Sequence, residues 1–269
     1  TMDLMVCTTE QITMDIRSFF LLIAVGCISG CAAVDSRTVF NETEALVIER
    51  GVKKIHWRRG GDEDAKVDEE VKDLLSRELT AADAVQIALL NNRRLQATYE
   101  SLSVAQSDLV AAGLLRNPVF DAEVRFAQAG GGTGLELAVV QNFIDIFFIP
   151  LRKRIAGAGL ESAKFRVSSE VLNLAAEVRK VFYTLQAGEQ TLQMRRQVLS
   201  ATEASYDLSK RLRAAKNITE LDLAKERVLY EQSKLDLRQA ELQVLRGRED
   251  LNNHLGLWGG ATKWKIQGT

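Results

Sequence analysis

The chain has 269 residues, of which 46% are hydrophobic and 26% charged, and both fractions lie within the range of folded proteins. The formal net charge is -1, and the Lys and Arg residues are spread along the chain, so we exclude nucleic acid as a partner. Only two prolines and few aromatic residues are present, which favours long helices.

Residues 1–30 carry the pattern of a secretory signal. An apolar run from Ser18 to Gly26 follows Arg17 and is too short to cross a bilayer as a mature helix, and Met14 is interpreted as the true start after an N-terminal extension. The segment ends in Ile-Ser-Gly-Cys31, which resembles the lipobox of bacterial lipoproteins. In that interpretation Cys31 is acylated, for example by palmitate, and becomes the first residue. The alternative is an ordinary signal peptide, or an unprocessed anchor, with a chance cysteine.

The segment that follows, residues 31–79, lacks a strong hydrophobic period and is predicted to be the anchor and a linker. Its acidic run from Asp62 to Glu70 is interpreted as a solvated surface rather than a metal site. A helix is predicted over residues 80–115, because Thr80 and Asp83 form an acidic variant of the capping box and Asn117-Pro118 ends the helical pattern.

Residues 119–144 change to a period of two and are predicted to form a hairpin. Apolar residues from Phe120 to Phe126 alternate with charged ones, a glycine cluster follows, and a second alternating run leads to Phe143. Two such strands fit a transmembrane β-barrel segment and an amphipathic soluble hairpin equally well by pattern. A two-stranded hairpin is not stable alone, so further strands are required from elsewhere. The glycines lack the Lys-Ser/Thr and the strand-to-helix context of a phosphate loop.

A long helix is predicted over residues 151–215 and a return helix over residues 220–254. The long segment has no proline after Pro150, and its apolar residues from Val167 to Leu192 recur on alternating four- and three-residue steps, the period of a coiled coil. Such a helix is ~95 Å long at ~1.5 Å per residue, so it must lie along other long helices. Thr219 and Asp222 supply the cap of the return helix.

The return helix carries two apolar stripes at heptad spacing. One stripe runs from Leu221 to Leu242 and the other from Leu223 to Leu251. Two stripes favour neighbouring helices on both sides, as in a ring of helices, although a simple three-helix bundle with a broad apolar face also fits.

No motif for catalysis or cofactor binding is found in the sequence. We see no nucleotide motif, metal-ligand cluster or catalytic triad, and we interpret His56 and His254 as isolated surface or helix-end residues. We therefore expect neither an enzyme nor a bound cofactor or metal.

Several short motifs follow one another between Cys31 and Leu257. They are LTAADAVQIA from Leu79, the Asn-Pro break, the hairpin, EVRKVFYTLQ within the long helix, NITELDL from Asn217 and LNNHLGL ending at Leu257. Their order and spacing resemble the TolC-like outer-membrane efflux proteins. The resemblance implies a mainly α fold of long antiparallel coiled-coil helices, the staves of an α-barrel, with one β-hairpin contributing to a transmembrane β-barrel. One such repeat would span residues 80–256.

The resemblance also implies roles for two sets of residues. The hairpin would turn its apolar residues to lipid and its charged residues to the pore, and the turn between the long helices would meet the adaptor protein of a tripartite pump. The lipid-facing candidates are Phe120, Ala122, Val124 and Phe126, the pore-facing candidates are Asp121, Glu123 and Arg125, and the adaptor-contact candidates are Arg213, Lys216, Asn217, Ile218, Thr219, Leu221 and Asp222. Lys216 stands where the family commonly has Gly.

By this resemblance the chain is a passive outer-membrane channel component of an efflux or secretion system, lipid-anchored with a large periplasmic part. Its expected partners are an adaptor, an inner-membrane pump, outer-membrane lipid and copies of itself. Family chains usually carry two repeats and this sequence contains one, so residues 257–269 are interpreted as the start of a link to a missing second repeat. A trimer is expected if the protein is full length and six copies if it is half length. The alternative function is a periplasmic coiled-coil lipoprotein scaffold without channel activity.

Overall fold

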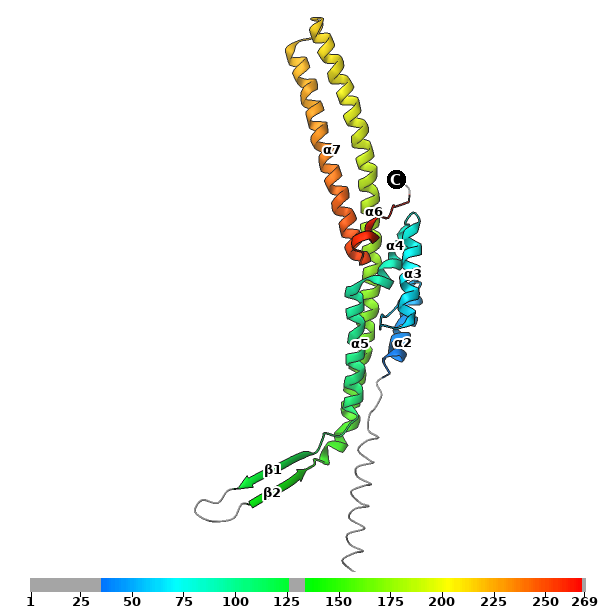
Figure 1. Cartoon of the computed structure of the whole chain (residues 1–269), viewed down its shortest axis with the longest axis vertical. Helices are drawn as coiled ribbons and strands as arrows, with labels where there is room; N and C mark the ends of the chain where they lie inside the picture. Colours follow the sequence, from blue (N-terminus) through cyan, green and yellow to red (C-terminus); the bar gives the residue numbers. More distant parts are fainter. Residues whose placement is uncertain (1–34, 126–133, 268–269) are drawn as a thin grey trace, which may run out of the picture. The chain divides into compact units, whose positions relative to one another are not determined.

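The computed structural model describes residues 35–125 and 134–267, so the predicted signal, the candidate lipidation site Cys31 and the candidate lipid-facing residue Phe126 lie outside the described residues. Long helices and one two-stranded antiparallel hairpin make up the described part, which confirms the mainly α fold class (Figure 1). The chain divides into two compact units. We call Gln106–Ala156 the hairpin unit, and Arg37–Ala105 together with the residues from Gly157 onward the helical unit.

The expected linker is folded in its described part. It contains helices α2 (Ser36–Ile48) and α3 (Asp62–Ser76), and α3 buries Val67, Val71 and Leu74 at helical spacing. The ring of Phe40 in α2 lies 5.6 Å from that of Trp57 and 5.1 Å from that of Tyr99. Such aromatic contacts stabilise a fold beyond the burial of area alone. The described part of this segment is therefore helical and packs within the helical unit, through contacts between residues far apart in sequence.

The helix predicted over residues 80–115 is two helices, α4 (Ala81–Asn91) and α5 (Arg93–Ala112). Its start follows the prediction, since the Asp83 backbone N–H donates to the Thr80 hydroxyl and the Thr80 backbone N–H donates back to Asp83. The break falls at Asn92, which has an extended backbone and whose side-chain oxygen accepts from the N–H of Leu95. Asn92 thus caps α5, as Asn commonly does at a helix start.

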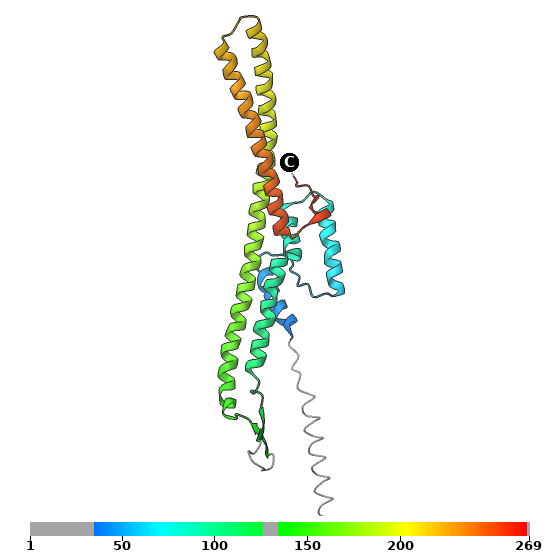
Figure 2. The ribbon, with the colours of Figure 1, turned by 60° about the vertical axis from the view of Figure 1, so that its left-hand side comes forward.

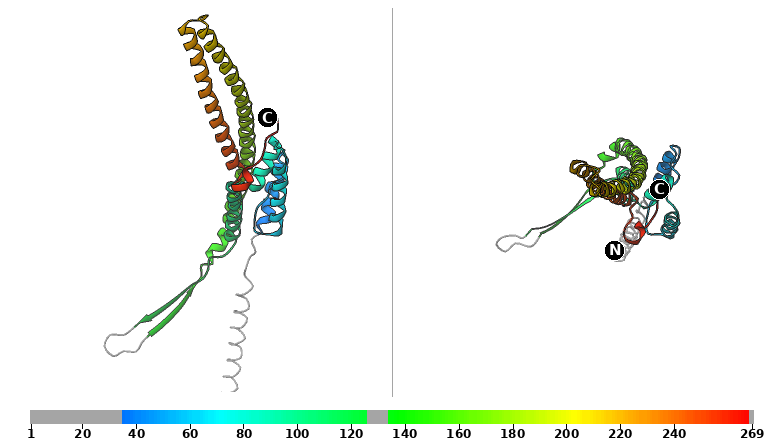
Figure 3. Two further views of the ribbon diagram at one scale, coloured as in Figure 1. Left: turned by 45° about the horizontal axis from the view of Figure 1, so that its top comes forward. Right: turned by 90° about the horizontal axis from the view of Figure 1, so that it is seen from above.

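Helix α6 (Ile149–Ala214) has 66 residues and runs antiparallel to α7 (Glu220–Leu255), which has 36 (Figures 1 and 2). Pro150 lies in the first turn of α6, where a missing N–H costs no hydrogen bond. The Cβ of an alanine in place of Gly188 would lie 3.7 Å from Val244, and one in place of Gly247 would lie 3.3 Å from Leu185. Small residues therefore let the two helices approach closely. Figure 3 shows the pair from two further directions.

The buried side of α6 follows the predicted coiled-coil period with small shifts. Val181 was expected on the apolar stripe, but Phe182 is the fully packed residue at that turn, and the neighbouring Tyr183 is exposed. The buried apolar positions from Val167 onward are Val167, Val171, Ala175, Val178, Phe182, Leu185 and Leu192.

The segment after α7 folds back onto the start of α4. It contains the short 3-10 helix η2 (Gly259–Thr262), and Ile266 pairs with Leu79 in an isolated parallel bridge. The Leu79 N–H donates to Lys265 at 2.7 Å, and the Trp264 indole N–H donates to Asn252 at 2.8 Å. Both Trp264 and Ile266 are buried. These contacts make the segment part of the helical unit.

Candidate membrane hairpin and helical turn

The hairpin consists of β1 (Val119–Arg125) and β2 (Gly134–Val140). Its register pairs Phe120 with Val139, Ala122 with Leu137, and Val124 with Leu135, so these six side chains share one face. Each of the five larger ones is between 48% and 68% exposed. The candidate lipid-facing residues within the described strand therefore form a continuous apolar face that no described residue of the hairpin unit covers.

The opposite face of the hairpin holds the three candidate pore-facing residues. Arg125 forms ion pairs with Glu123 and with Glu136 of the partner strand, both at 3.0 Å, and Asp121 lies opposite Ala138. All of these side chains are exposed. All the charged side chains of the two strands thus lie on one face, together with the Val119–Val140 pair at its end, and the other face carries only apolar side chains.

The turn between α6 and α7 closes with a regular hydrogen-bond pattern. The N–H of Asn217 donates to Leu212, and the N–H of Lys216 donates to Arg213, each at 2.9 Å. These two bonds define a Schellman motif, whose left-handed position is usually Gly. Lys216 occupies it with φ of 61°. The departure from the family pattern therefore leaves the turn geometry intact.

The remaining candidate contact residues of the turn hold its second half. The Thr219 hydroxyl and its backbone N–H both donate to Asp222, and the Asp222 N–H donates to the Thr219 hydroxyl. These bonds from Thr219 hold the pKa of Asp222 below its ordinary value. The Arg213 guanidinium donates to Glu220 at 2.8 Å and to the Ile218 carbonyl at 3.2 Å. The turn is a largely exposed loop that these hydrogen bonds hold at both ends.

The two apolar stripes of α7 have different surroundings. Val244 and Leu251 of one stripe are buried against the rest of the helical unit. The other stripe is between 53% and 67% exposed and consists of Leu221, Val228, Leu235 and Leu242. A heptad stripe of this kind is the usual contact of a coiled coil. The exposed stripe has no partner helix among the described residues of this chain.

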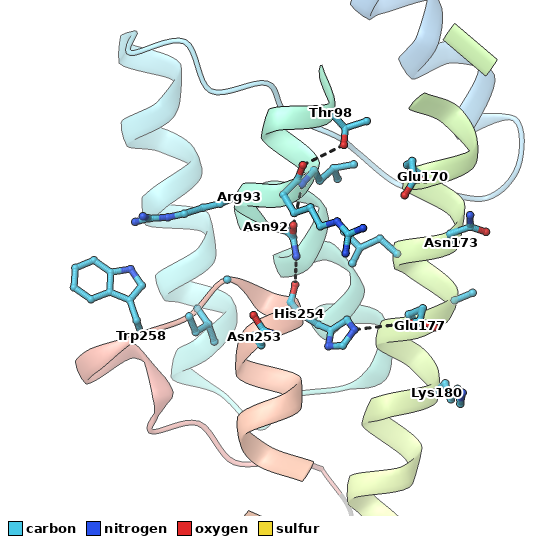
Figure 4. A pocket seen from close by; sticks show the side chains of 16 residues that line it. Asn92, Arg93, Thr98, Glu170, Asn173, Glu177, Lys180, Asn253, His254 and Trp258 are labelled. Carbon is cyan, nitrogen blue, oxygen red and sulfur yellow. Dashed lines mark hydrogen bonds and ion pairs between the residues drawn. The ribbon is translucent and has the colours of Figure 1, made fainter. Parts of the chain in front are cut away.

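An open cleft of about 800 Å³ lies in the helical unit, where the end of α7 meets α5 and α6 (Figure 4). The Asn92 amide donates to the His254 carbonyl at 2.8 Å, and the His254 ring lies 3.4 Å from the Glu177 carboxylate. His56 likewise contacts Asp64 at 2.6 Å. Both histidines therefore have carboxylate partners rather than being isolated: His254 links α7 to α6, and His56 links the segment between α2 and α3 to α3.

The described residues show no arrangement that suggests chemistry in this cleft or elsewhere. No cluster of His, Cys, Asp and Glu side chains among them could hold a metal ion. Within the same residues, no helix has the length and apolar character that crossing a membrane requires.

Sequence reasoning missed two functional features. Asn91 and Asn92 follow the LTAADAVQIA motif closely and were given no role, but their amides donate to the carbonyls that end α7. A run of exposed apolar residues after β2, which includes the short 3-10 helix η1 (Ile144–Phe148), was also missed. The signal was the aromatic composition of that run next to the basic cluster that begins at Arg152.

Neither a protein-family model nor a curated protein sequence matches this chain. Solved structures do match. CusC, described in connection with transmembrane channel formation, has 17% identity and a TM-score of 0.57, and the match covers 70% of this chain and 46% of CusC. The outer-membrane channel OprN has 17% identity and a TM-score of 0.57, and the match covers 80% of this chain and 50% of OprN. The Campylobacter jejuni CmeC outer membrane channel has 14% identity and a TM-score of 0.57, and the match covers 80% of this chain and 47% of CmeC.

The chain has the fold of TolC-like outer-membrane channels. The fold expected from the resemblance is thereby confirmed. This chain spans about half the length of each of these channel chains, the share that one of two repeats would cover.

Proposed function

We propose that this chain is one repeat of an outer-membrane channel that conducts its substrate passively, as part of a tripartite efflux or secretion system. The observation that carries the proposal is the hairpin, whose whole apolar face is exposed while its charges gather on the other face. This polarity is the one that a barrel strand between lipid and an aqueous pore requires. The lipid anchor at Cys31 and a large periplasmic part belong to the same proposal.

The channel requires more strands than the two that the described residues form. The two described strands pair only with each other, which leaves an unpaired backbone edge on each side of the hairpin. Unpaired edges are not tolerated in a bilayer, because backbone groups there have no water to bind. We therefore propose that several repeats close one barrel, as a trimer if a second repeat accompanies this one and as six copies if this repeat acts alone.

The exposed stripe of α7 supports assembly of the helices. Its four residues from Leu221 to Leu242 repeat every seven positions, so one helix of a neighbouring repeat can pack along it. The Val244 and Leu251 stripe already packs within the chain. Helix α7 would then have neighbours on both sides, as a stave in a ring of helices does.

The turn from Arg213 to Asp222 is proposed as the contact for an adaptor protein. Its backbone is fixed at both ends, by the left-handed Lys216 and by the capping box of Thr219. Because Arg213 is already bound to Glu220, a partner meets a pre-organised surface rather than a loose loop. An inner-membrane pump would supply the energy for transport.

Two alanines on opposite faces of the hairpin provide a matched test. Ala122 lies on the apolar face opposite Leu137, and Ala138 lies on the polar face opposite Asp121. We expect Ala122→Arg to block membrane assembly, because a charge on the lipid face costs ~2–4 kcal/mol at mid-bilayer, whereas lumen substitutions are tolerated. Ala138→Arg should assemble normally. The measurements are the yield of heat-modifiable oligomer and single-channel conductance in planar bilayers.

The competing function is a periplasmic coiled-coil scaffold, which the exposed stripe of α7 would also serve. A scaffold has no strand in the membrane, so both arginine variants would behave like the wild-type chain and no conductance would be seen. Equal assembly of the two variants would therefore replace the channel proposal with the scaffold.

A further inference from the structure

The hairpin unit continues past β2 into a second exposed apolar region, which we call the interfacial segment (residues 143–155). It comprises Phe143, η1 and the first turns of α6. Its most exposed side chain, Phe147, is 84% accessible. The other exposed apolar residues of the segment are Phe143, Ile144, Ile146, Phe148, Leu151 and Ile155. Clustered aromatic exposure of this kind marks a surface with a partner.

The same segment carries three adjacent cations. Arg152, Lys153 and Arg154 follow one another in the first turns of α6, where no acidic residue is present. The single acid of the segment, Asp145, already forms an ion pair with Arg116 at 3.0 Å. No described residue forms an ion pair with Arg152, Lys153 or Arg154, so these cations make a positive group beside the exposed aromatic residues.

Helical geometry orders the charges around the apolar residues. At about 100° per residue, Leu151 and Ile155 fall on one side of α6, with Arg152 and Arg154 on the two flanks of that side. Arg152 also donates to the Asp145 carbonyl of η1. An apolar stripe flanked by long basic side chains is typical of a helix that lies at a membrane surface.

We propose that the interfacial segment binds the headgroup region of a phospholipid membrane and prefers anionic lipid. The aromatic and branched side chains enter the boundary of the acyl chains, and Arg152 and Arg154, on the flanks of the apolar side, bind headgroup phosphates. Lys153, on the opposite side of α6, adds its charge to the same positive group. Continuity with the apolar face of the hairpin favours lipid as the partner, because the chain passes from β2 into the segment within a few residues. Aromatic residues and cations at the edge of a membrane-spanning region are a general pattern. The inference rests on the proposed channel function.

The test measures binding of the full chain to phosphatidylcholine vesicles with and without phosphatidylglycerol. Replacing Arg152, Lys153 and Arg154 together by Gln should weaken binding to the anionic vesicles roughly 100-fold, since each cation near such a surface contributes ~1 kcal/mol. Binding to pure phosphatidylcholine should change little, and high salt should remove the difference between the two vesicles. A double variant, Phe147→Ser with Phe148→Ser, should weaken binding to both vesicles alike.

A second triple variant controls for net charge. Arg166, Arg179 and Lys180 are exposed cations of the same helix α6, in its helical-unit part, and replacing them by Gln removes the same charge elsewhere. This control should keep its preference for anionic vesicles. An equal loss in both triple variants would overturn the inference, because net charge alone would then explain the binding. Circular dichroism of each variant checks that the helices are retained.

The arginine variant of the hairpin separates this inference from the channel proposal. If the triple variant at Arg152 to Arg154 binds both vesicles like wild type while Ala122→Arg blocks assembly, the lipid role of the segment is wrong and the channel proposal stands. If the anionic preference is lost in the triple variant but Ala122→Arg assembles like Ala138→Arg, the segment binds lipid and the channel proposal falls.

Discussion

Helices α6 and α7 end in the same backbone turn with different residues at its critical position. In both turns two N–H groups donate back to the last helical turn in the Schellman pattern, and one residue is left-handed. That residue is Lys216 after α6, with φ of 61°, and Gly256 after α7, with φ of 68°. The backbone motif is therefore the same, and the surroundings decide which residue it tolerates.

The surroundings of Gly256 leave no room for a side chain. A Cβ at this position would lie 2.7 Å from the Asn91 carbonyl oxygen, and the Asn91 amide donates to the carbonyls of Leu255 and Gly256. The turn after α7 is thus closely packed against Asn91 inside the helical unit. Lys216 instead sits in an exposed turn and bears only the strain of the left-handed backbone. The open turn is the one available to a partner.

The largest effect expected from this comparison is that of Gly256→Ala. It should lower the free energy of unfolding by more than ~2 kcal/mol. The cost of a left-handed alanine, ~1–2 kcal/mol, adds to the cost of displacing the Asn91 backbone. Gly259 provides the control, since it has φ of 60° but open space around its Cβ position. Gly259→Ala should cost only the backbone term. Denaturant unfolding followed by circular dichroism measures both.

Equal losses of stability in Gly256→Ala and Gly259→Ala would contradict close packing around Gly256. The close approach of Asn91 would then contribute nothing, and the two turns would differ only in sequence.

A smaller loss of stability is expected for Thr219→Ala, at the other end of the exposed turn between α6 and α7. Thr219 accepts from the Asp222 N–H at 3.1 Å and caps α7. Removing such a cap typically costs ~1 kcal/mol. The loss should be local, so amide hydrogen exchange should quicken in the first turn of α7 and stay unchanged near Leu251. Thr219→Ser keeps the hydroxyl and should restore protection; if it does not, the cap is not the cause.

The comparison also shows which parts of the structure the sequence could predict. The capping boxes at Thr80 and Thr219 and the period of α6 were predictable because they depend on residues three or four positions apart. The hairpin register followed from alternation in the same way. The break between α4 and α5 at Asn92 was not predictable, because the Asn92 amide donates to His254, 162 residues further along the chain.

The same distinction applies to the candidate site. Lys216 was flagged as a departure from the family pattern, yet the turn forms, because an exposed left-handed residue needs only to bear a modest strain. The folding of α2 and α3 was missed because Phe40, Trp57 and Tyr99 meet only in the tertiary structure. Local chemistry was predictable, and contacts distant in sequence were not.

Lys216→Gly should stabilise the chain by ~0.5–1 kcal/mol, because Gly adopts the left-handed backbone without a steric penalty. The variant also removes a charge, so Lys216→Ala is the matched control: it removes the same charge and keeps the strain. Only the glycine variant should raise the unfolding midpoint. A similar gain in both variants would assign the effect to charge and not to the backbone.

The smallest expected effect concerns the pH dependence of the same turn. Hydrogen bonds from Thr219 lower the pKa of Asp222 below the ordinary 3.8, so its stabilising contribution is present above that value and is lost as pH falls through the lowered pKa. In Thr219→Ala the pKa should return toward 3.8, measured by NMR titration of the Asp222 carboxyl carbon. Asp207, whose pKa is lowered by Lys210 instead, should titrate as before. An unchanged Asp222 titration would show that the capping box does not hold this carboxylate in solution.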